Sequence, residues 1–276
     1  MNTLKTMIVH LDGTAQAAAR LALARDLAQA HRARLTAVFA VSPRFVPLPV
    51  PWVDGLPSAP LMDEIDPTHR ARARATLDHV LRDTLVPVRF EEVNNEPPVA
   101  GMVRRARLAD LVVFGQPDPS DTAGIDVPRR FIASVLIDAG TPGLVVPFAG
   151  TAQAEPQRVL VGWKSSREAA RALASALPLL CRARAVHVAL AVRGAGHSDG
   201  RALEAYLHAH GVRNLHLHRD CPDEGAGEAL LALAAEIHAE LLVMGCFGHG
   251  QAREWVLGGA SRTVLASSTL PVWMAH

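Results

Sequence analysis

One feature constrains the fold of this chain more than any other: the same order of segments occurs twice. Short apolar or β-branched segments alternate with longer Ala-, Leu- and Arg-rich segments of helical period, which predicts alternating strands and helices. The expected strands are apolar throughout, so we expect parallel strands covered by helices on both faces. They are residues 7–11, 35–41, 86–90, 111–114 and 143–146 in the first half, and 159–163, 186–192, 215–218, 241–244 and 272–274 in the second.

Two matched segments support this internal duplication. Residues 32–34 match residues 182–184, and residues 109–115 match residues 239–245. The first half is longer between these points, and the proline-rich segment 42–65 accounts for the extra length. Proline cannot contribute to a sheet ladder or a helix interior, so this segment is expected to be a surface excursion after the second strand.

The chain is therefore expected to be an α/β protein with two tandem, doubly wound, mostly parallel sheets of five strands each and helices on both faces. Residues 148–157 have no apolar period and predict a linker between two domains, residues 1–149 and 157–276. In an open sheet of this kind a ligand binds at the carboxyl ends of the strands, where the strand order reverses.

Charge and cysteine content exclude several classes of protein. Lys and Arg number 28 against 27 Asp and Glu, without runs of like charge, so neither a nucleic-acid nor a membrane surface is expected. The N-terminus lacks a signal-peptide core, and apolar stretches stay short of the ~18 residues that a membrane helix needs. Cys181, Cys221 and Cys246 form no C-x-x-C pair and are expected to be reduced thiols. A cytoplasmic protein is expected.

Glycines crowd the end of one expected strand and the start of the next helix, over residues 245–261. Gly245 and Gly248 allow backbone amides to approach a ligand closely, and residues 258–261 would present free helix N-terminal amides and a hydroxyl to an anion. Phosphate is the natural occupant, and the alternative is a flexible strand-to-helix connection. His249 lies inside this segment and either meets a phosphate oxygen or is a solvated loop residue.

The spacing Gly245-x-x-Gly248, nine residues, Gly258, followed by a helix and Leu270-Pro271-Val272, resembles the nucleotide-binding motif of the universal stress protein (UspA-like) family. Residues 8–14 resemble its first strand, and residues 159–166 hold the equivalent place in the second half. The resemblance covers the chain as a tandem of two such domains. It implies an adenine nucleotide alpha hydrolase-like, Rossmann-like fold and an ATP-linked role in stress response or signalling. The implied binding residues for ATP, with or without Mg²⁺, are Lys164, Val192, Gly245, Gly248, His249, Gly250, Gly258, Gly259, Ala260 and Ser261.

The second half departs from this motif at two positions. In ATP-binding members a Ser or Thr follows the last motif glycine, whereas here Gly259 follows it and Ser261 is the nearest hydroxyl. This removes about one hydrogen bond to phosphate, ~0.5–1.5 kcal/mol. Lys164 stands where the family has an adenine-side aspartate and cannot accept a hydrogen bond from an adenine amino group, although its charge could move toward phosphate.

The first half has the opposite defect. Asp12 matches the adenine-side aspartate, but the fourth strand is followed by Gly115-Gln116-Pro117-Asp118-Pro119, without the second glycine. Asp118, Asp121 and Asp126 would repel phosphate in this loop. The first half is therefore expected to be a degenerate structural partner that binds no triphosphate.

Histidine and cysteine residues suggest two further hypotheses. His208 and His210, and His216 and His218, form H-x-H pairs that could hold a metal because alternate strand residues share a face. No acidic or cysteine cluster has matching spacing, so half-exposed polar positions are preferred and no metal site is expected. A helix N-terminus near Cys246 could lower its pKa, but a redox role is the minority hypothesis because no resolving cysteine is close in sequence.

Sequence signatures of catalysis, such as G-x-S-x-G, H-E-x-x-H and G-x-x-x-x-G-K-[ST], do not occur. Ser165 and Ser166 are interpreted as helix caps. The leading hypothesis is thus a stress-response protein that binds an adenine nucleotide through its second half. The alternatives are an interaction scaffold of the same family that binds no nucleotide and, last, a weak ATP hydrolase, for which no carboxylate is evident beside residues 245–261.

The closing strands lead to a prediction of assembly. Residues 143–147 and 271–275 are apolar, and an exposed apolar edge invites aggregation. In relatives the last strand pairs with its counterpart from a second domain. The two halves are therefore expected to pack as a pseudo-twofold dimer within one chain, and a homodimer of whole chains remains open.

Overall fold

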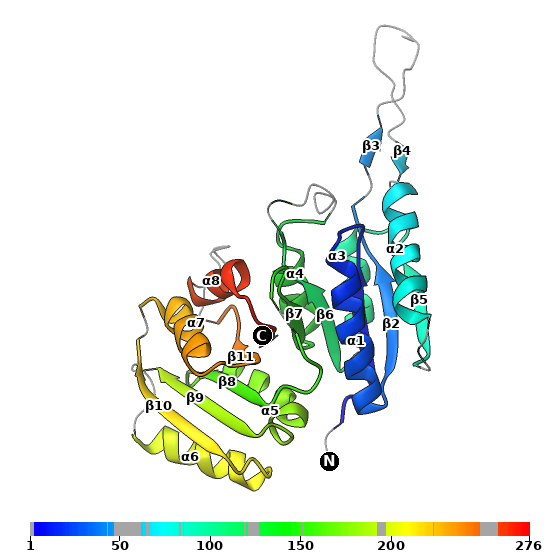
Figure 1. Ribbon diagram of the computed structural model, residues 1–276. Helices are drawn as coiled ribbons and strands as arrows, with labels where there is room; N and C mark the ends of the chain where they lie inside the picture. Colours follow the sequence, from blue (N-terminus) through cyan, green and yellow to red (C-terminus); the bar gives the residue numbers. More distant parts are fainter. Residues whose placement is uncertain are drawn as a thin grey trace, which may run out of the picture.

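The computed structural model describes residues 3–42, 44–46, 62–64, 67–82, 84, 86–118, 120, 127–150, 152–191, 197–222, 224–248 and 259–276. Within these residues the two halves contain the same series of elements, except that the first half also has β3 and β4 (Figure 1). The first half comprises β1 (Thr6–Leu11), α1 (Ala17–His31), β2 (Arg34–Phe39), β3 (Arg44–Val46), β4 (Met62–Glu64), α2 (Pro67–Leu81), β5 (Val88–Glu92), α3 (Pro98–Ala106), β6 (Leu111–Gly115), α4 (Phe131–Ala139) and β7 (Gly143–Val146). The second comprises β8 (Arg158–Trp163), α5 (Arg167–Leu180), β9 (Ala185–Ala191), α6 (His197–Ala209), β10 (Leu215–Cys221), α7 (Ala226–Glu236), β11 (Leu241–Gly245), α8 (Gly259–Ser267) and β12 (Val272–Ala275).

The α/β fold class and the expected strands are confirmed, with shifts at the strand ends. Each half has five parallel strands in the same spatial order, with the first strand between the second and the fourth. The strand order therefore reverses beside β1 and β6 in the first half and beside β8 and β11 in the second. These two places are the switch points at which a ligand is expected.

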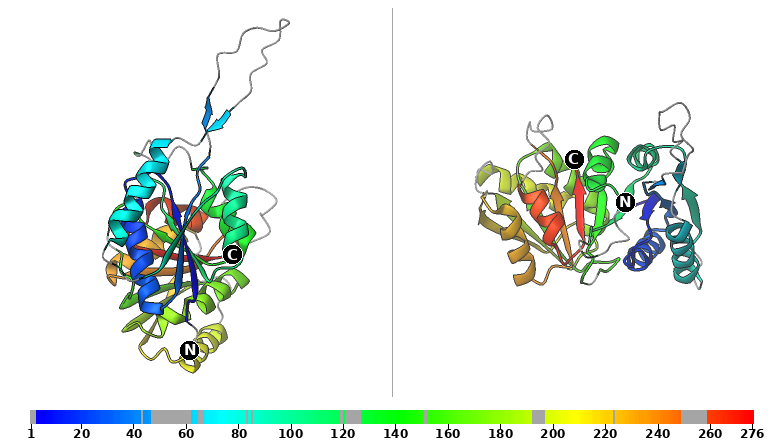
Figure 2. Two further views of the ribbon diagram at one scale, coloured as in Figure 1. Left: turned by 90° about the vertical axis from the view of Figure 1, so that its right-hand side faces the viewer. Right: turned by 90° about the horizontal axis from the view of Figure 1, so that it is seen from above.

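The two five-stranded sheets join into one sheet of ten strands, ordered β10-β9-β8-β11-β12-β7-β6-β1-β2-β5. The closing strands β7 and β12 pair antiparallel at the centre, with Leu144 opposite Trp273 (Figure 2). This is the pairing within one chain that the apolar closing segments predict. It removes both apolar edges from solvent.

The expectation that the proline-rich segment contributes to no sheet was wrong at its ends. β3 and β4 form a two-stranded antiparallel ladder that extends away from the main sheet (Figure 1). Neither strand contains a proline, so their backbone amides can serve the ladder. Residues 47–61 lie outside the described residues.

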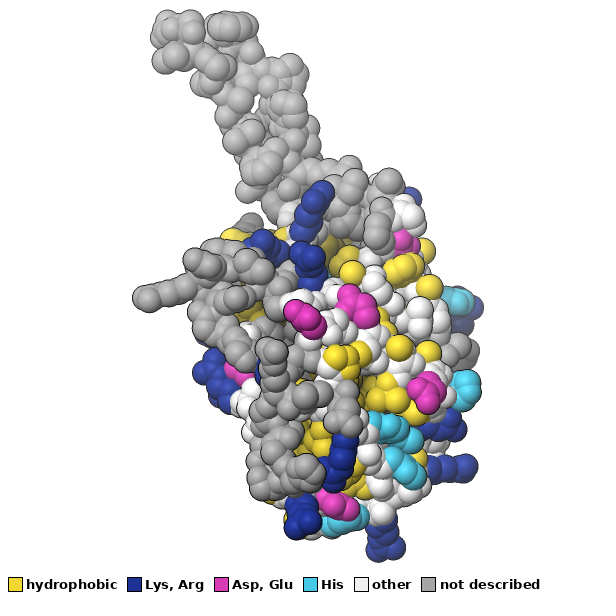
Figure 3. All heavy atoms as spheres, turned by 90° about the vertical axis from the view of Figure 1, so that its left-hand side faces the viewer, with side chains coloured by type: hydrophobic (Ala, Val, Ile, Leu, Met, Phe, Trp, Pro, Cys, Tyr) yellow, Lys and Arg dark blue, Asp and Glu magenta, His cyan; other side chains and the backbone are white. Residues whose placement is uncertain are grey.

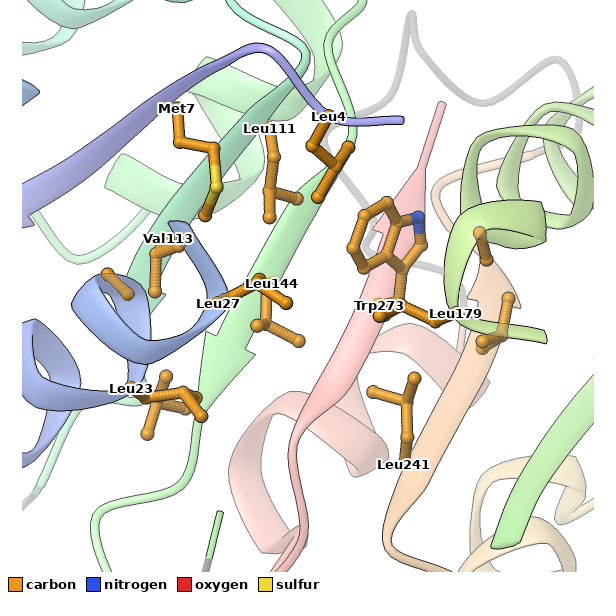
Figure 4. Close-up of a cluster of buried hydrophobic side chains, with 14 of the residues drawn as sticks. Leu4, Met7, Leu23, Leu27, Leu111, Val113, Leu144, Leu179, Leu241 and Trp273 are labelled. Atoms are coloured by element: carbon orange, nitrogen blue, oxygen red, sulfur yellow. The ribbon is translucent and has the colours of Figure 1, made fainter. Parts of the chain in front are cut away.

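Two apolar layers hold the sheet between its helices. One layer contains residues of α1, α2, α5 and α6, and the other contains residues of α3, α4, α7 and α8. The first layer crosses the junction of the halves, where Leu144 and Trp273 face the same side of the sheet (Figure 4). The indole of Trp273 is fully buried, and its Nε1 donates to Ser175 Oγ on α5 at 2.9 Å. The junction is therefore part of the core.

A polar contact also connects the halves. Gln116, after β6, donates from Nε2 to the Leu265 carbonyl of α8 at 3.0 Å. Its Oε1 accepts from the backbone N–H of Phe148 at 3.0 Å.

Among the described helices, none has the length and apolar character that crossing a membrane requires.

Candidate functional site

A cavity of about 260 Å³ lies at the switch point of the second half, at the carboxyl ends of β8, β9 and β11. Apolar side chains form its inner wall, and the turn after β11 and the first turn of α8 form its rim. The described charged residues of the lining are Lys164 and Glu168. The wall is lined by Ala189, Ala191, Leu230 and Met244, and the rim by Gly245, Phe247, Gly248, Gly259, Ala260 and Ser261.

The structure brings six of the predicted binding residues together around this cavity: Lys164, Gly245, Gly248, Gly259, Ala260 and Ser261. Four other predicted residues, Val192, His249, Gly250 and Gly258, lie outside the described residues. Asp12 belongs to the other half and is described below.

Gly245 and Gly248 have a packing role that spacing alone does not reveal. A Cβ at Gly245 would lie 2.5 Å from the backbone N of Ala169, and a Cβ at Gly248 would lie 2.9 Å from Glu168 Oε2. Neither glycine has a positive φ. The first turn of α5 therefore approaches both positions closely whether or not a ligand is bound, and at Gly245 it does so with its backbone.

Ser261 fastens the turn after β11 to the first turn of α8. Its buried Oγ accepts from the backbone N–H of Phe247 at 3.3 Å. Phe247 has a φ of 57°, a left-handed conformation that is uncommon for an aromatic residue. The Ser261 hydroxyl keeps its own proton to donate, and the first amides of α8 have no intrahelical partner. The rim can thus donate several hydrogen bonds to an anion.

Glu168 is a cavity residue that the sequence analysis missed. Its side chain, in the first turn of α5, contacts Gly248, and the residue is only 5% exposed. Burial opposes ionisation, yet hydrogen bonds, chiefly from Arg167 Nε at 2.5 Å, lower the pKa of Glu168 below its usual value. The expectation that no carboxylate adjoins residues 245–261 was therefore wrong, because that proximity joins two segments far apart in the sequence. The sequence signal that could have found it is an acidic residue, Glu168, in the first turn of the helix that follows β8.

Two smaller predictions near the cavity have opposite outcomes. Ser166 caps α5, since its side chain accepts from the backbone N–H of Ala169 at 3.2 Å. The hypothesis of a reactive Cys246 is wrong. Cys246 is 1% exposed, and burial together with the charge of Glu168 raises the pKa of its thiol.

The first half fills its own switch point with side chains. Asp12 pairs with Arg20, with Nη2 2.9 Å from Oδ1, and both residues are buried. Burial opposes ionisation of Asp12, but the Arg20 charge and the hydrogen bond from Thr14 hold its pKa far below the usual range. The Arg20 guanidinium also packs over Gly115. In the second half Ala172 holds the position of Arg20, leaving only a methyl group there.

A second pair closes the outer part of the same region. Gln16 donates from Nε2 to Asp118 Oδ2 at 3.0 Å, and Asp118 Oδ1 accepts from the backbone and hydroxyl of Ser120. Counting from the strands of each half, Gln16 and Asp118 correspond to Glu168 and Gly248. The loop position that is a glycine in the second half thus carries its own carboxylate in the first.

The histidines of β10 share a face, as their spacing predicts; His216 is exposed and His218 is half-buried. His216 stacks on His187 of β9 with 4.6 Å between ring centroids, and His187 Nδ1 lies 2.9 Å from His218 Nε2. Histidine side chains gather on the face of the molecule that carries this sheet edge (Figure 3). His208 and His210 are exposed near the end of α6. Within the described residues, no group of three or more His, Cys, Asp or Glu side chains is placed to hold a metal.

Comparisons with known proteins support a family assignment. A model of the universal stress protein family matches residues 155–276. A solved universal stress protein from Archaeoglobus fulgidus is similar over 98% of this chain and 95% of that chain, with 20% identity and a TM-score of 0.68. A proposed universal stress protein (16% identity) and a protein of unknown function (15% identity), both from Pseudomonas aeruginosa, each match 99% of this chain, and 93% and 92% of theirs, with TM-scores of 0.57. No curated protein matches the chain. Over residues 155–276 the chain matches the model of the universal stress protein family, and over its whole length it has the fold of a solved universal stress protein.

Proposed function

We propose that the second half binds an adenine nucleotide, with ATP as the leading candidate, and that the protein acts in stress response or signalling. The observation that carries this proposal is the cavity of about 260 Å³, which combines an apolar wall with hydrogen-bond donors at a switch point. Its volume is just below the range of about 300–1,000 Å³ that is usual for small-molecule sites.

In this proposal the phosphates bind at the rim of the cavity. The first-turn amides of α8 and the Ser261 hydroxyl donate to phosphate oxygens, and the N-terminal end of the helix dipole favours a negative ligand. Lys164 adds a positive charge to the same lining. His249, Gly250 and Gly258 complete the proposed phosphate-binding segment.

The base is proposed to lie against the inner wall. Ala189 and Ala191 of β9, Leu230 of α7 and Met244 of β11 line this wall. The two alanines leave room beside the strand, and an adenine ring gains from burying its apolar faces. Val192, which follows β9 in the sequence, stays a proposed binding residue outside the described residues.

Thermal melting with and without ATP and Mg²⁺ tests the proposal. A ligand at 100 times its dissociation constant stabilises the folded state by ~2.7 kcal/mol, which gives a readily measured shift. Ser261→Ala should reduce the shift, because a hydrogen bond to a charged group is worth about 1.5–3 kcal/mol. Ser267→Ala is the matched control, since Ser267 is exposed at the other end of the same helix. A melt that no adenine or guanine nucleotide moves would favour the scaffold hypothesis instead.

A further inference from the structure

Glu168 places a negative charge where the proposed ligand would bring its phosphates. The carboxylate lies against Gly248, in the turn that Ser261 fastens to the first turn of α8. A phosphate bound at that helix terminus would share this turn with Glu168. Two negative charges held a few ångströms apart at a partly buried site repel strongly.

The rest of the described cavity does not neutralise a polyphosphate. Arg167 pairs with Glu168, but its side chain is 72% exposed and is screened by water. Lys164 supplies one positive charge to the lining, whereas a nucleotide polyphosphate carries several negative charges. Within the described lining, a polyphosphate is therefore better neutralised when a cation accompanies it.

At the corresponding position of the first half, a hydrogen-bond donor faces an acceptor. There the amide of Gln16 donates to the carboxylate of Asp118 at 3.0 Å. In the second half an acceptor, Glu168, replaces the donor, and Gly248 replaces the carboxylate. The second half thus places a carboxylate, paired with Arg167, against the glycine turn at the rim, where a cation that arrives with the ligand can be held between this carboxylate and a phosphate.

We propose, on the basis of the proposed function, that Glu168 is a specificity-determining residue that admits a nucleotide polyphosphate only together with a divalent cation. A carboxylate oxygen and phosphate oxygens are the ligands with which proteins commonly hold Mg²⁺. The described residues contain no group of three or more ligating side chains that could hold a metal by themselves. The cation is therefore bound with the nucleotide and not before it.

Calorimetric titration of the full chain with ATP, in MgCl₂ and in EDTA, tests this proposal. We expect the affinity of the parent for ATP to fall by about tenfold or more when EDTA replaces Mg²⁺, because the carboxylate then repels the phosphates directly. In Glu168→Gln the two affinities should agree within about twofold, since the neutral amide neither repels phosphate nor holds the cation. Mg²⁺ alone should give no binding heat with either protein.

Glu204→Gln is the matched control, because Glu204 lies on α6, outside the cavity lining, and the change in charge is the same. This variant should keep the Mg²⁺ dependence of the parent. Equal affinity of the parent for ATP in both buffers would overturn the proposal, even if Glu168→Gln failed to fold. A Mg²⁺ dependence that persists in folded Glu168→Gln would also overturn it. Failure of the parent to bind ATP in either buffer would instead refute the proposed function itself, and this inference with it.

Discussion

At the scale of single residues, the buried ion pair of the first half makes the sharpest prediction. Asp12→Asn leaves the Arg20 guanidinium, 3% exposed, without its negative partner. Removing one member of a buried pair costs about 3–5 kcal/mol, so urea unfolding should show a loss of stability of this size. Asp12→Asn combined with Arg20→Met should recover much of it, because no charge is then left buried.

The same variant tests which half binds the ligand. ATP affinity of Asp12→Asn, measured by calorimetry under conditions where the variant is folded, should equal that of the parent, because the switch point of the first half is filled by its own side chains. Loss of ATP binding in this variant would contradict the assignment of the site to the second half.

Stability should also depend on pH through a buried histidine. Burial lowers the pKa of His10 to about 4, whereas the unfolded chain binds this proton near pH 6.5. The stabilisation is complete above pH 6.5 and is lost as the pH falls toward 4, because the unfolded state takes up the proton first. The loss for His10 is up to about 3 kcal/mol. Burial and the neighbouring histidines also lower the pKa of His187 to about 4, which adds an effect of the same sign, reduced by solvent screening because His187 is only partly buried.

Urea unfolding of the parent and of His10→Gln at pH 7.5 and pH 5.0 measures this effect. The glutamine side chain does not titrate, so the difference in unfolding free energy between the two pH values should be smaller in the variant. Equal differences in the two proteins would show that His10 is protonated to the same extent in the folded and unfolded states.

At the scale of elements, the contact between α5 and the turn after β11 predicts that two motif glycines, Gly245 and Gly248, differ in their tolerance of a side chain. A Cβ at Gly245 would strike the backbone of α5, whereas a Cβ at Gly248 would meet only the end of the Glu168 side chain, which can move. Gly245→Ala should therefore lose about 1–3 kcal/mol of stability, and Gly248→Ala less. Thermal melting of both variants checks the order, and a larger loss for Gly248→Ala would contradict it.

What could be predicted from the sequence at this scale was the local pattern. The ten strands of the main sheet follow from short apolar segments, and the helix start at Ser166 follows from capping chemistry. Contacts between distant segments could not be predicted. Glu168 against Gly248, His187 against His216 and Arg20 over Gly115 each depend on how two elements pack, and no local spacing encodes that. The β3 and β4 ladder was missed for the same reason.

At the scale of the whole molecule, the two halves share one architecture but differ in the chemistry of their switch points. The first half closes its switch point with the Asp12–Arg20 pair, and the second leaves a cavity lined by Lys164 and Glu168. The continuous sheet and the shared apolar layer tie the two together. The first half, whose switch point is filled, thus supplies β7 as a partner strand for β12 of the second half. This agrees with a structural role for residues 1–149.

This arrangement makes a prediction for the isolated second half. Expressing residues 157–276 alone removes β7 and so exposes β12, with its unpaired backbone groups and the Trp273 face that Leu144 covers in the full chain. An apolar edge of this kind pairs with any available strand, and a second copy offers the same edge in the same antiparallel geometry. Light scattering after gel filtration should therefore find a dimer or larger aggregates of the fragment. Met274→Pro in the fragment removes one ladder donor and should weaken this association. A stable monomeric fragment would show that β12 does not need a partner strand, and would remove the physical reason for the central β7–β12 junction.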